Sequence, residues 1–277
     1  MSHRALTQGN VAVITGGAAG IGLALAEDFA AAGLRIALLD RTQDALDSAV
    51  ARLGEMTEAL GILTDVSQPS TLAAAAAQVT ERWGGTDILV ANAGIQTGST
   101  VLGDGPAWDN VLAVNLRGVI DTVRAFGPGM VARGRDGAII CTGSKQGITT
   151  PPGDPAYNVA KAGVKAFTEA LAHELRTTKD CRITAHLLIP GFVFTGLTSR
   201  GRTEKPDGAW TPEQMATFAV ERLHAGDFYI LCPDNDVTRE LDEKRMAWAI
   251  GDIIENRPAL SRWHPDYADA FQRFVSG

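Results

Sequence analysis

The stretch Val11-Ala12-Val13-Ile14-Thr15-Gly16-Gly17-Ala18-Ala19-Gly20-Ile21-Gly22 decides the fold. Its first five residues, Val11–Thr15, form an apolar run that predicts a short buried strand. The glycines that follow allow a tight backbone turn, and a helix is expected near residues 20–32. A helix N-terminus after such a turn presents backbone amides and a partial positive charge to a phosphate group. We therefore expect this turn to bind the pyrophosphate of a dinucleotide.

Strand and helix signals alternate along the rest of the chain. Strands are expected at 11–15, 35–40, 61–64, 88–92, 138–142, 183–189 and 228–231, and helices near 20–32, 42–53, 69–83, 106–127, 155–178, 212–225 and 237–256. Several of these strands lack polar alternation, which is typical of strands buried on both faces of a parallel sheet. The pattern predicts an α/β fold, a Rossmann-type doubly wound sheet of about seven parallel strands flanked by helices on both faces. No repeat or linker divides residues 1–277, so we expect a single domain.

Tyr157 and Lys161 stand at positions i and i+4 of one predicted helix, downstream of Ser144. Such positions share a helix face, so the ammonium should lie close to the phenol ring. A nearby positive charge favours the ionised form of an acid and should lower the phenol pKa from its usual value of ~10. We expect Tyr157 to act as general acid/base, with Ser144 bonding the substrate carbonyl or the tyrosine oxygen. Asp154 and Pro155 predict the N-cap and first residue of this helix.

Asp40 ends the second predicted strand, near the spacing expected for a carboxylate that binds the adenosine ribose. Its charge would repel a 2′-phosphate, which favours NAD over NADP. Arg41 is adjacent and could pair with such a phosphate, so NADP stays open as the less favoured cofactor.

In joint order and spacing, these features resemble the short-chain dehydrogenase/reductase family, in its compact single-domain branch. The resemblance rests on the Thr15–Gly22 turn, Asp65-Val66, Asn92-Ala93-Gly94, Asn115, Ser144, Tyr157, Lys161 and Pro190-Gly191, and it runs from about Gly9 to about Thr195. It implies reversible hydride transfer between a secondary alcohol, or its ketone, and the nicotinamide.

The resemblance also assigns roles to individual residues. The catalytic set it implies is Asn115, Ser144, Tyr157 and Lys161, where Asn115 holds a water of the proton relay and Lys161 also binds the nicotinamide ribose. The cofactor-binding set that we expect is Gly16, Ala19, Gly20, Ile21, Gly22, Asp40, Arg41, Asp65, Val66, Asn92, Ala93, Gly94, Tyr157, Lys161, Pro190, Gly191, Val193 and Thr195. Alternatives are an NADP-dependent carbonyl reductase and a non-catalytic NAD(P)-binding sensor.

The amino-acid composition indicates which classes of binding partner and which cellular location to expect. The chain has 25 Lys and Arg against 32 Asp and Glu, a net charge of −7, which disfavours nucleic acid. No apolar run approaches the ~18 residues of a membrane span, and the first residues lack a signal core, so a cytoplasmic protein is expected. Cys141, Cys181 and Cys232 are interpreted as reduced thiols. We expect no metal site, since the run Asp234-Asn235-Asp236 predicts a turn and lacks the glycine and glutamate of a calcium loop.

The C-terminal third is less typical of the family. Residues 192–210 are expected to form a mobile substrate loop, and residues 233–277 a C-terminal extension. The proposed pocket walls are Ile95, Gln96, Ile148, Phe192, Phe194 and Trp210, which favour a moderately apolar substrate. The family resemblance implies a homodimer or homotetramer formed through the helices near 106–127 and 155–178.

Overall fold

A computed structural model describes residues 3–103, 105–199 and 201–277 of the chain. At its centre lies a seven-stranded sheet in the order β3-β2-β1-β4-β5-β6-β7, with every neighbouring pair parallel. The strands are β1 (Val11–Thr15), β2 (Arg35–Asp40), β3 (Ala59–Leu63), β4 (Ile88–Ala91), β5 (Gly137–Thr142), β6 (Ile183–Ile189) and β7 (Tyr229–Leu231). This confirms the predicted fold class. The strand order reverses between β1 and β4, and ligands of doubly wound sheets bind at such a point.

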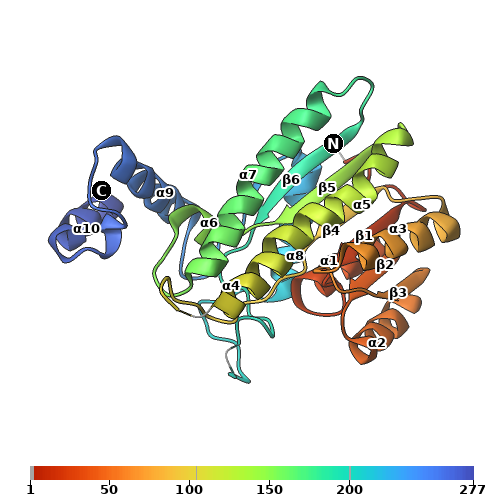
Figure 1. Cartoon of the computed structure of the whole chain (residues 1–277), viewed down its shortest axis with the longest axis horizontal. Coiled ribbons are helices and arrows are strands. Elements are labelled where there is room, and N and C mark those ends of the chain that lie inside the picture. Colours follow the sequence, from red (N-terminus) through yellow and green to blue (C-terminus); the bar gives the residue numbers. More distant parts are fainter. Residues whose placement is uncertain (1–2, 104, 200) are drawn as a thin grey trace.

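Helices cover both faces of this sheet (Figure 1). They are α1 (Gly20–Ala31), α2 (Gln43–Gly54), α3 (Pro69–Trp83), α4 (Gly105–Leu112), α5 (Gly118–Ala132), α6 (Gln146–Thr149), α7 (Pro155–Thr177), α8 (Pro212–Ala225), α9 (Arg239–Ile254) and α10 (Ala268–Ser276), with a π-helix η1 (Ala113–Arg117) and 3-10 turns η2 (Ser261–Trp263) and η3 (Pro265–Tyr267). Helices α1, α2 and α8 pack on one face, and α3, α5 and α7 on the other.

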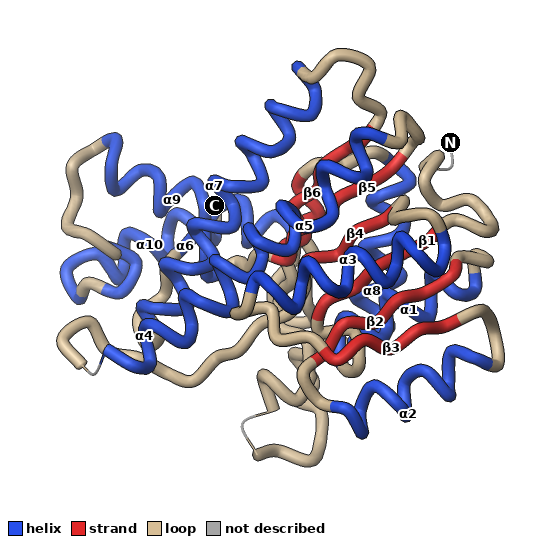
Figure 2. The backbone as a smooth tube through the Cα atoms, turned by 45° about the vertical axis from the view of Figure 1, so that its right-hand side comes forward, coloured by secondary structure: helices blue, strands red, loops and turns tan. Residues whose placement is uncertain are grey.

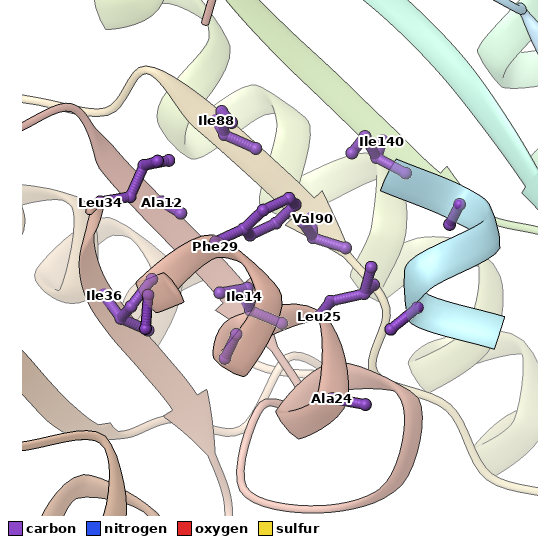
Figure 3. Packing of buried hydrophobic residues seen from close by; sticks show 14 of the residues in the cluster. Ala12, Ile14, Ala24, Leu25, Phe29, Leu34, Ile36, Ile88, Val90 and Ile140 are labelled. Atoms are coloured by element: carbon purple, nitrogen blue, oxygen red, sulfur yellow. The ribbon is translucent and has the colours of Figure 1, made fainter. Parts of the chain in front are cut away.

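The first strand shows why the apolar runs lack polar alternation. Ala12 and Ile14 join the core beneath α1, where Figure 3 shows them beside Phe29. Val11 and Val13 join the core on the opposite face. All four side chains are fully buried. A strand covered by helices on both sides therefore has no solvent-facing positions at which polar residues would alternate with apolar ones.

The predicted helix 106–127 is interrupted, and this corrects the sequence expectation. A π-helical turn, Ala113–Arg117, separates α4 from α5, and α5 continues to Ala132. The buried Asn115 sits within that turn. Such π-helical turns occur frequently at functional sites.

The C-terminal segment, residues 233–277, contains elements that the sequence did not predict, namely η2, η3 and α10. Figures 1 and 2 show α9 and α10 beyond α6, away from the sheet. They enclose a small core of their own, in which the Trp248 ring packs against Phe271 and Phe274 at 5.4 and 5.3 Å between centroids. The Arg257 guanidinium lies 4.1 Å from the Trp248 ring centroid.

Two smaller expectations can be compared with the structure. The three cysteines form no disulfide. Among the described residues, no helix has both the length and the apolar character needed to cross a membrane.

Candidate active site

A cavity of about 560 Å³ opens at the carboxyl ends of the strands, where the loops after β1, β2, β3, β4, β5 and β6 meet. Volumes of this order are typical of small-molecule and cofactor sites, which span roughly 300–1,000 Å³. Of the expected site residues, those that line it are Gly16, Ala19, Gly20, Ile21, Asp40, Arg41, Asp65, Val66, Asn92, Ala93, Gly94, Ser144, Tyr157, Lys161, Pro190, Gly191, Val193 and Thr195. Gly22 and Asn115 are not among the lining residues.

The glycine-rich turn forms one wall of this cavity. Gly16 has φ +62°, and a Cβ there would lie 2.9 Å from the Cα of Ala93, so the position requires glycine. The side chain of Asn92 donates to the carbonyls of Thr15 (3.2 Å) and Gly16 (3.3 Å), which fastens the turn to the loop after β4. Ala19, the N-cap of α1, makes no side-chain capping bond, so the first amides of α1 are not capped by a side chain.

Gly22 acts behind the turn and not at the cavity. A Cβ there would lie 2.2 Å from the Gly16 carbonyl oxygen. Its role in the structure is therefore close packing of α1 against the turn. The sequence placed it among the cofactor-binding residues because the glycine spacing alone does not separate the two roles.

Asp40, the last residue of β2, lines the cavity next to the glycine-rich turn. One carboxylate oxygen accepts from the Ala18 amide at 3.2 Å and the other from the Arg41 amide at 2.8 Å. These bonds hold the carboxylate at the cavity wall, and each oxygen keeps a lone pair for a further donor. Arg41 lines the same cavity.

Asp65 and Val66 lie in the loop between β3 and α3. The Asp65 carboxylate accepts from the amide and the hydroxyl of Ser67, at 2.9 and 2.7 Å. Both residues line the cavity, and Asp65 also orders the turn that begins the helix.

Asn115 supports the cavity from behind. Its side-chain amide donates to the Ile95 carbonyl at 2.7 Å and its oxygen accepts from the Ile95 amide at 2.8 Å. This pair of bonds ties the π-helical turn to the loop that follows Asn92-Ala93-Gly94. Asn115 is fully buried.

Ser144, Tyr157 and Lys161 meet on the wall nearest α7. Tyr157 lies in the first turn of α7, whose N-cap is Asp154, and Ser144 shares a hydrogen bond with the phenol. The Lys161 ammonium donates to the Thr142 carbonyl at 2.7 Å and lies 5.7 Å from the centroid of the Tyr157 ring. The i, i+4 spacing thus brings cation and phenol to one face as predicted.

The pKa values of this pair differ from the sequence expectation. Burial raises the pKa of Tyr157 to about 12, although the Ser144 hydrogen bond opposes the rise and the charge of Asp154 adds to it. Burial also lowers the pKa of Lys161 to about 8. In the protein alone, the loss of solvation dominates the phenol pKa, and Lys161 is not among the causes of the shift.

Asp154 occupies the predicted N-cap position without performing the capping bond. Its carboxylate accepts from the Ser99 hydroxyl at 2.6 Å, and the Ser99 oxygen accepts from the Ala156 amide at 2.9 Å. Ser99 therefore satisfies an amide of the first turn of α7 in place of Asp154. Pro155 is the first helical residue, as predicted.

The predicted substrate loop, 192–210, is closed at its base by backbone bonds. The Trp210 amide donates to the Phe192 carbonyl and the Phe194 amide to the Trp210 carbonyl, each at 2.9 Å. Of the proposed pocket walls, Ile95, Gln96 and Phe192 line the cavity, whereas Ile148, Phe194 and Trp210 do not. Trp210 packs instead on Phe218, and Arg200 of this loop lies outside the described residues.

Several lining residues were missed from sequence. They are Leu39, Thr64, Val114, Thr142, Gly143, Lys145, Gln146, Gly196, Leu197 and Thr198. Lys145 and Gln146 directly follow Ser144, and that adjacency was the available signal. Whether they face the cavity depends on the short helix α6, which the sequence did not predict.

Comparison with known proteins identifies the family. The family model for short chain dehydrogenase matches residues 10–206. The chain belongs to the short-chain dehydrogenase/reductase family. A curated relative, galactitol 2-dehydrogenase (L-tagatose-forming) from Cereibacter sphaeroides, is 40% identical over 202 residues, covering 72% of this chain and 77% of the relative.

Solved structures share this fold over most of the chain. A short-chain dehydrogenase/reductase from Burkholderia phymatum in complex with NAD has a TM-score of 0.83 and 30% identity, covering 93% of this chain and 98% of that one. L-sorbose reductase from Gluconobacter frateurii, complexed with NADPH and L-sorbose, has a TM-score of 0.73 and 29% identity, covering 86% of this chain and all of that one (100%). Members of the family with this fold thus bind either nicotinamide cofactor.

Proposed function

We propose that the protein is an NAD-dependent oxidoreductase that interconverts a secondary alcohol and its ketone, with Tyr157 as acid/base. The observation that carries this proposal is that Ser144, Tyr157 and Lys161 line one continuous cavity with the glycine turn and Asp40. A proton-transfer group and a dinucleotide cradle in one cavity are the two parts that alcohol oxidation by hydride transfer needs.

The residues present fit a nicotinamide dinucleotide. The amides at the start of α1 lack a side-chain cap and suit a pyrophosphate, and Asp40 suits the adenosine ribose hydroxyls. Asp65 and Val66 would flank the adenine. Pro190, Gly191, Val193 and Thr195 would contact the carboxamide end. When bound, the nicotinamide would accept or return the hydride, and its oxidised ring would add positive charge near the phenol.

The remaining steps belong to the chain's own side chains. Ser144 donates to the substrate oxygen and orients it. The Tyr157 oxygen takes the hydroxyl proton during oxidation and returns it during reduction. Lys161, held by the Thr142 carbonyl, keeps its positive charge beside the ring and stabilises the phenolate. Asn115 is proposed to complete the proton relay from behind the Ile95 loop.

The substrate class is proposed from the same cavity. Ile95, Phe192 and Leu197 supply apolar surface to the cavity that Ser144 lines, while Gln96 and Gln146 supply polar groups. We propose a moderately apolar alcohol or ketone. A turnover assay with NADH and a panel of ketones tests the proposal, and a protein that binds NADH without oxidising it with any ketone would instead be a sensor.

The cofactor preference gives a first prediction. A 2′-phosphate placed at Asp40 would set two anions ~4 Å apart, worth roughly 4 kcal/mol at an effective dielectric of ~20. If ~2 kcal/mol survives solvent and Arg41, NAD is preferred about thirtyfold. We expect Asp40→Ala to remove this preference, as measured by kcat/KM for NADH and NADPH on one ketone.

Asp40→Asn is the matched control for that experiment. The asparagine removes the negative charge, while its amide oxygen can still accept from the Ala18 amide. The variant therefore distinguishes the effect of the charge on cofactor preference from the effect of the hydrogen bond that orders the turn. A preference for NADPH in the unmutated protein would mean that Arg41 outweighs Asp40, and the cofactor assignment would be reversed.

The assembly gives a second prediction. We propose at least a homodimer, through the helices α4, α5 and α7 that the family resemblance implies. Val159 on α7 is 49% exposed in one chain, an apolar side chain available to such an interface. Light scattering at micromolar concentration should give at least twice the chain mass of 29.2 kDa. A monomeric mass would contradict the proposal.

A further inference from the structure

A second, smaller cavity lies next to the first, between α6 and the C-terminal segment. Its volume is about 60 Å³, and its lining residues are Lys145, Ile148, Thr149, Leu231, Asp242, Arg245, Met246 and Arg262. Lys145, the residue after Ser144, also lines the large cavity, so one side chain forms part of both walls.

Three cationic side chains surround this small cavity, and one of them is already neutralised. The Lys145 ammonium contacts the carboxylates of Asp234 at 3.2 Å and Asp242 at 2.5 Å. Asp234 also accepts from the Phe192 amide at 3.0 Å. Both nearby carboxylates therefore contact Lys145, and the charge of Asp242 also acts on Arg245 and Arg262.

In the described part of the chain, neither Arg245 nor Arg262 forms a close ion pair of this kind. Within residues 3–103, 105–199 and 201–277, no carboxylate lies within 4.0 Å of either guanidinium, since neither takes part in an ion pair. The Nε of Arg245 is buried and makes no hydrogen bond to the described part of the protein. A buried donor without an acceptor costs on the order of 1–3 kcal/mol, more for a charged group, which marks the position as ready for an acceptor.

The packing holds these two cations together. The Arg262 guanidinium lies over the rings of Trp263 and Phe271, at 4.7 and 5.1 Å from their centroids. Burial lowers the pKa of Arg262, the charge of Arg245 lowers it further, and the charge of Asp242 opposes the shift only in part. An anion between them would relieve that repulsion.

We propose that this cavity binds a small oxyanionic group, a carboxylate or a phosphate, between Arg245 and Arg262. By the same measure of volume a single water needs only roughly 10–15 Å³, so a cavity of about 60 Å³ admits such a group. Guanidinium groups are suited to planar carboxylate and to phosphate oxygens. The oxyanionic group is either part of the substrate or a free anion, and the two arginines would recognise it in the same way. The first of these sources rests on the proposed function.

Direct binding is measured first and needs no turnover. Thermal melts of the full chain with acetate and with phosphate, against chloride at equal ionic strength, should show a saturable rise in Tm for the wild type. Arg245→Met and Arg262→Met should lose that rise, and Arg245→Lys should keep part of it. The control Arg239→Met, on the same helix but exposed and paired with Glu243, should behave as the wild type.

A second arm identifies the source of the anion. For a matched keto acid and its methyl ester, Arg245→Met should raise KM for the acid by about tenfold or more and leave the ester unchanged, if the substrate supplies the group. Saturable binding of free anions with no difference between acid and ester assigns the site to a free anion. If no ketone is turned over, the proposed function fails while the melts still test the site. Equal responses to anions in wild type and both methionine variants, with acid and ester also equal, would overturn the proposal.

Discussion

Tyr157→Phe should abolish most turnover while nucleotide binding persists. The phenylalanine keeps the ring that packs in the wall of the cavity but has no proton to exchange with the substrate oxygen. Loss of a positioned acid/base typically costs ~100 to 10,000-fold. The measurement is kcat with NADH and an active ketone, together with NADH affinity by fluorescence.

Tyr229→Phe is the matched control for this variant. Tyr229 is on β7, 49% exposed, and its hydroxyl donates to Glu169. It does not line the cavity, so its loss should leave kcat unchanged. A Tyr157→Phe protein that retained more than about a tenth of wild-type turnover would show that another group moves the proton.

Lys161→Met should lower turnover by a similar order and should also weaken nucleotide binding. The variant keeps most of the stem that fills the buried position but removes the ammonium near Tyr157 and its bond to the Thr142 carbonyl. Tyr157→Phe should affect kcat alone, so a combined loss in kcat and in cofactor affinity distinguishes the two roles. The same measurements of kcat and of NADH affinity by fluorescence apply.

The fold of the Lys161 variant can be checked by its dependence on pH. The pKa of Lys161 is lowered from 10.5 to about 8, so the folded state disfavours the charged form. That cost is fully present below pH 8 and disappears as the pH rises toward 10.5, so stability from this group increases across that window. The variant should lack this increase and should melt cooperatively at pH 7. Lys165→Met, exposed on the same helix and paired with Glu169, should match the wild type in all respects. Unchanged kcat and cofactor affinity in Lys161→Met would show that Lys161 has no role in turnover or in nucleotide binding.

A large part of the fold could be predicted from local sequence patterns, because the formation of these strands and helices depends on residues that are neighbours in the chain. The apolar runs at 11–15, 35–40 and 183–189 coincide with β1, β2 and β6. Each is bounded by turn residues and covered on both faces, so its composition alone predicts a buried strand. Pro155 likewise marked the first residue of α7, because proline is well tolerated at that position and disfavoured further into a helix.

Sequence patterns did not predict the structure correctly where contacts with segments distant in the chain determine the conformation. The π-helical turn at Ala113–Arg117 is accompanied by the Asn115 bonds to Ile95, across the loop after β4. The wall residues Phe194 and Trp210 were assigned to the cavity on hydrophobicity, but backbone pairing at the base of the loop joins them, and Trp210 packs on Phe218.

By itself, the sequence determined the α/β architecture, the glycine turn and the pairing of Tyr157 with Lys161, since each depends on residues close together in the chain. Tertiary structure alone decided that Lys145 joins Asp234 and Asp242, that Arg245 and Arg262 meet beside it, and that burial raises the Tyr157 pKa. These properties depend on solvent exclusion and on contacts between residues far apart in the chain, which no local pattern encodes.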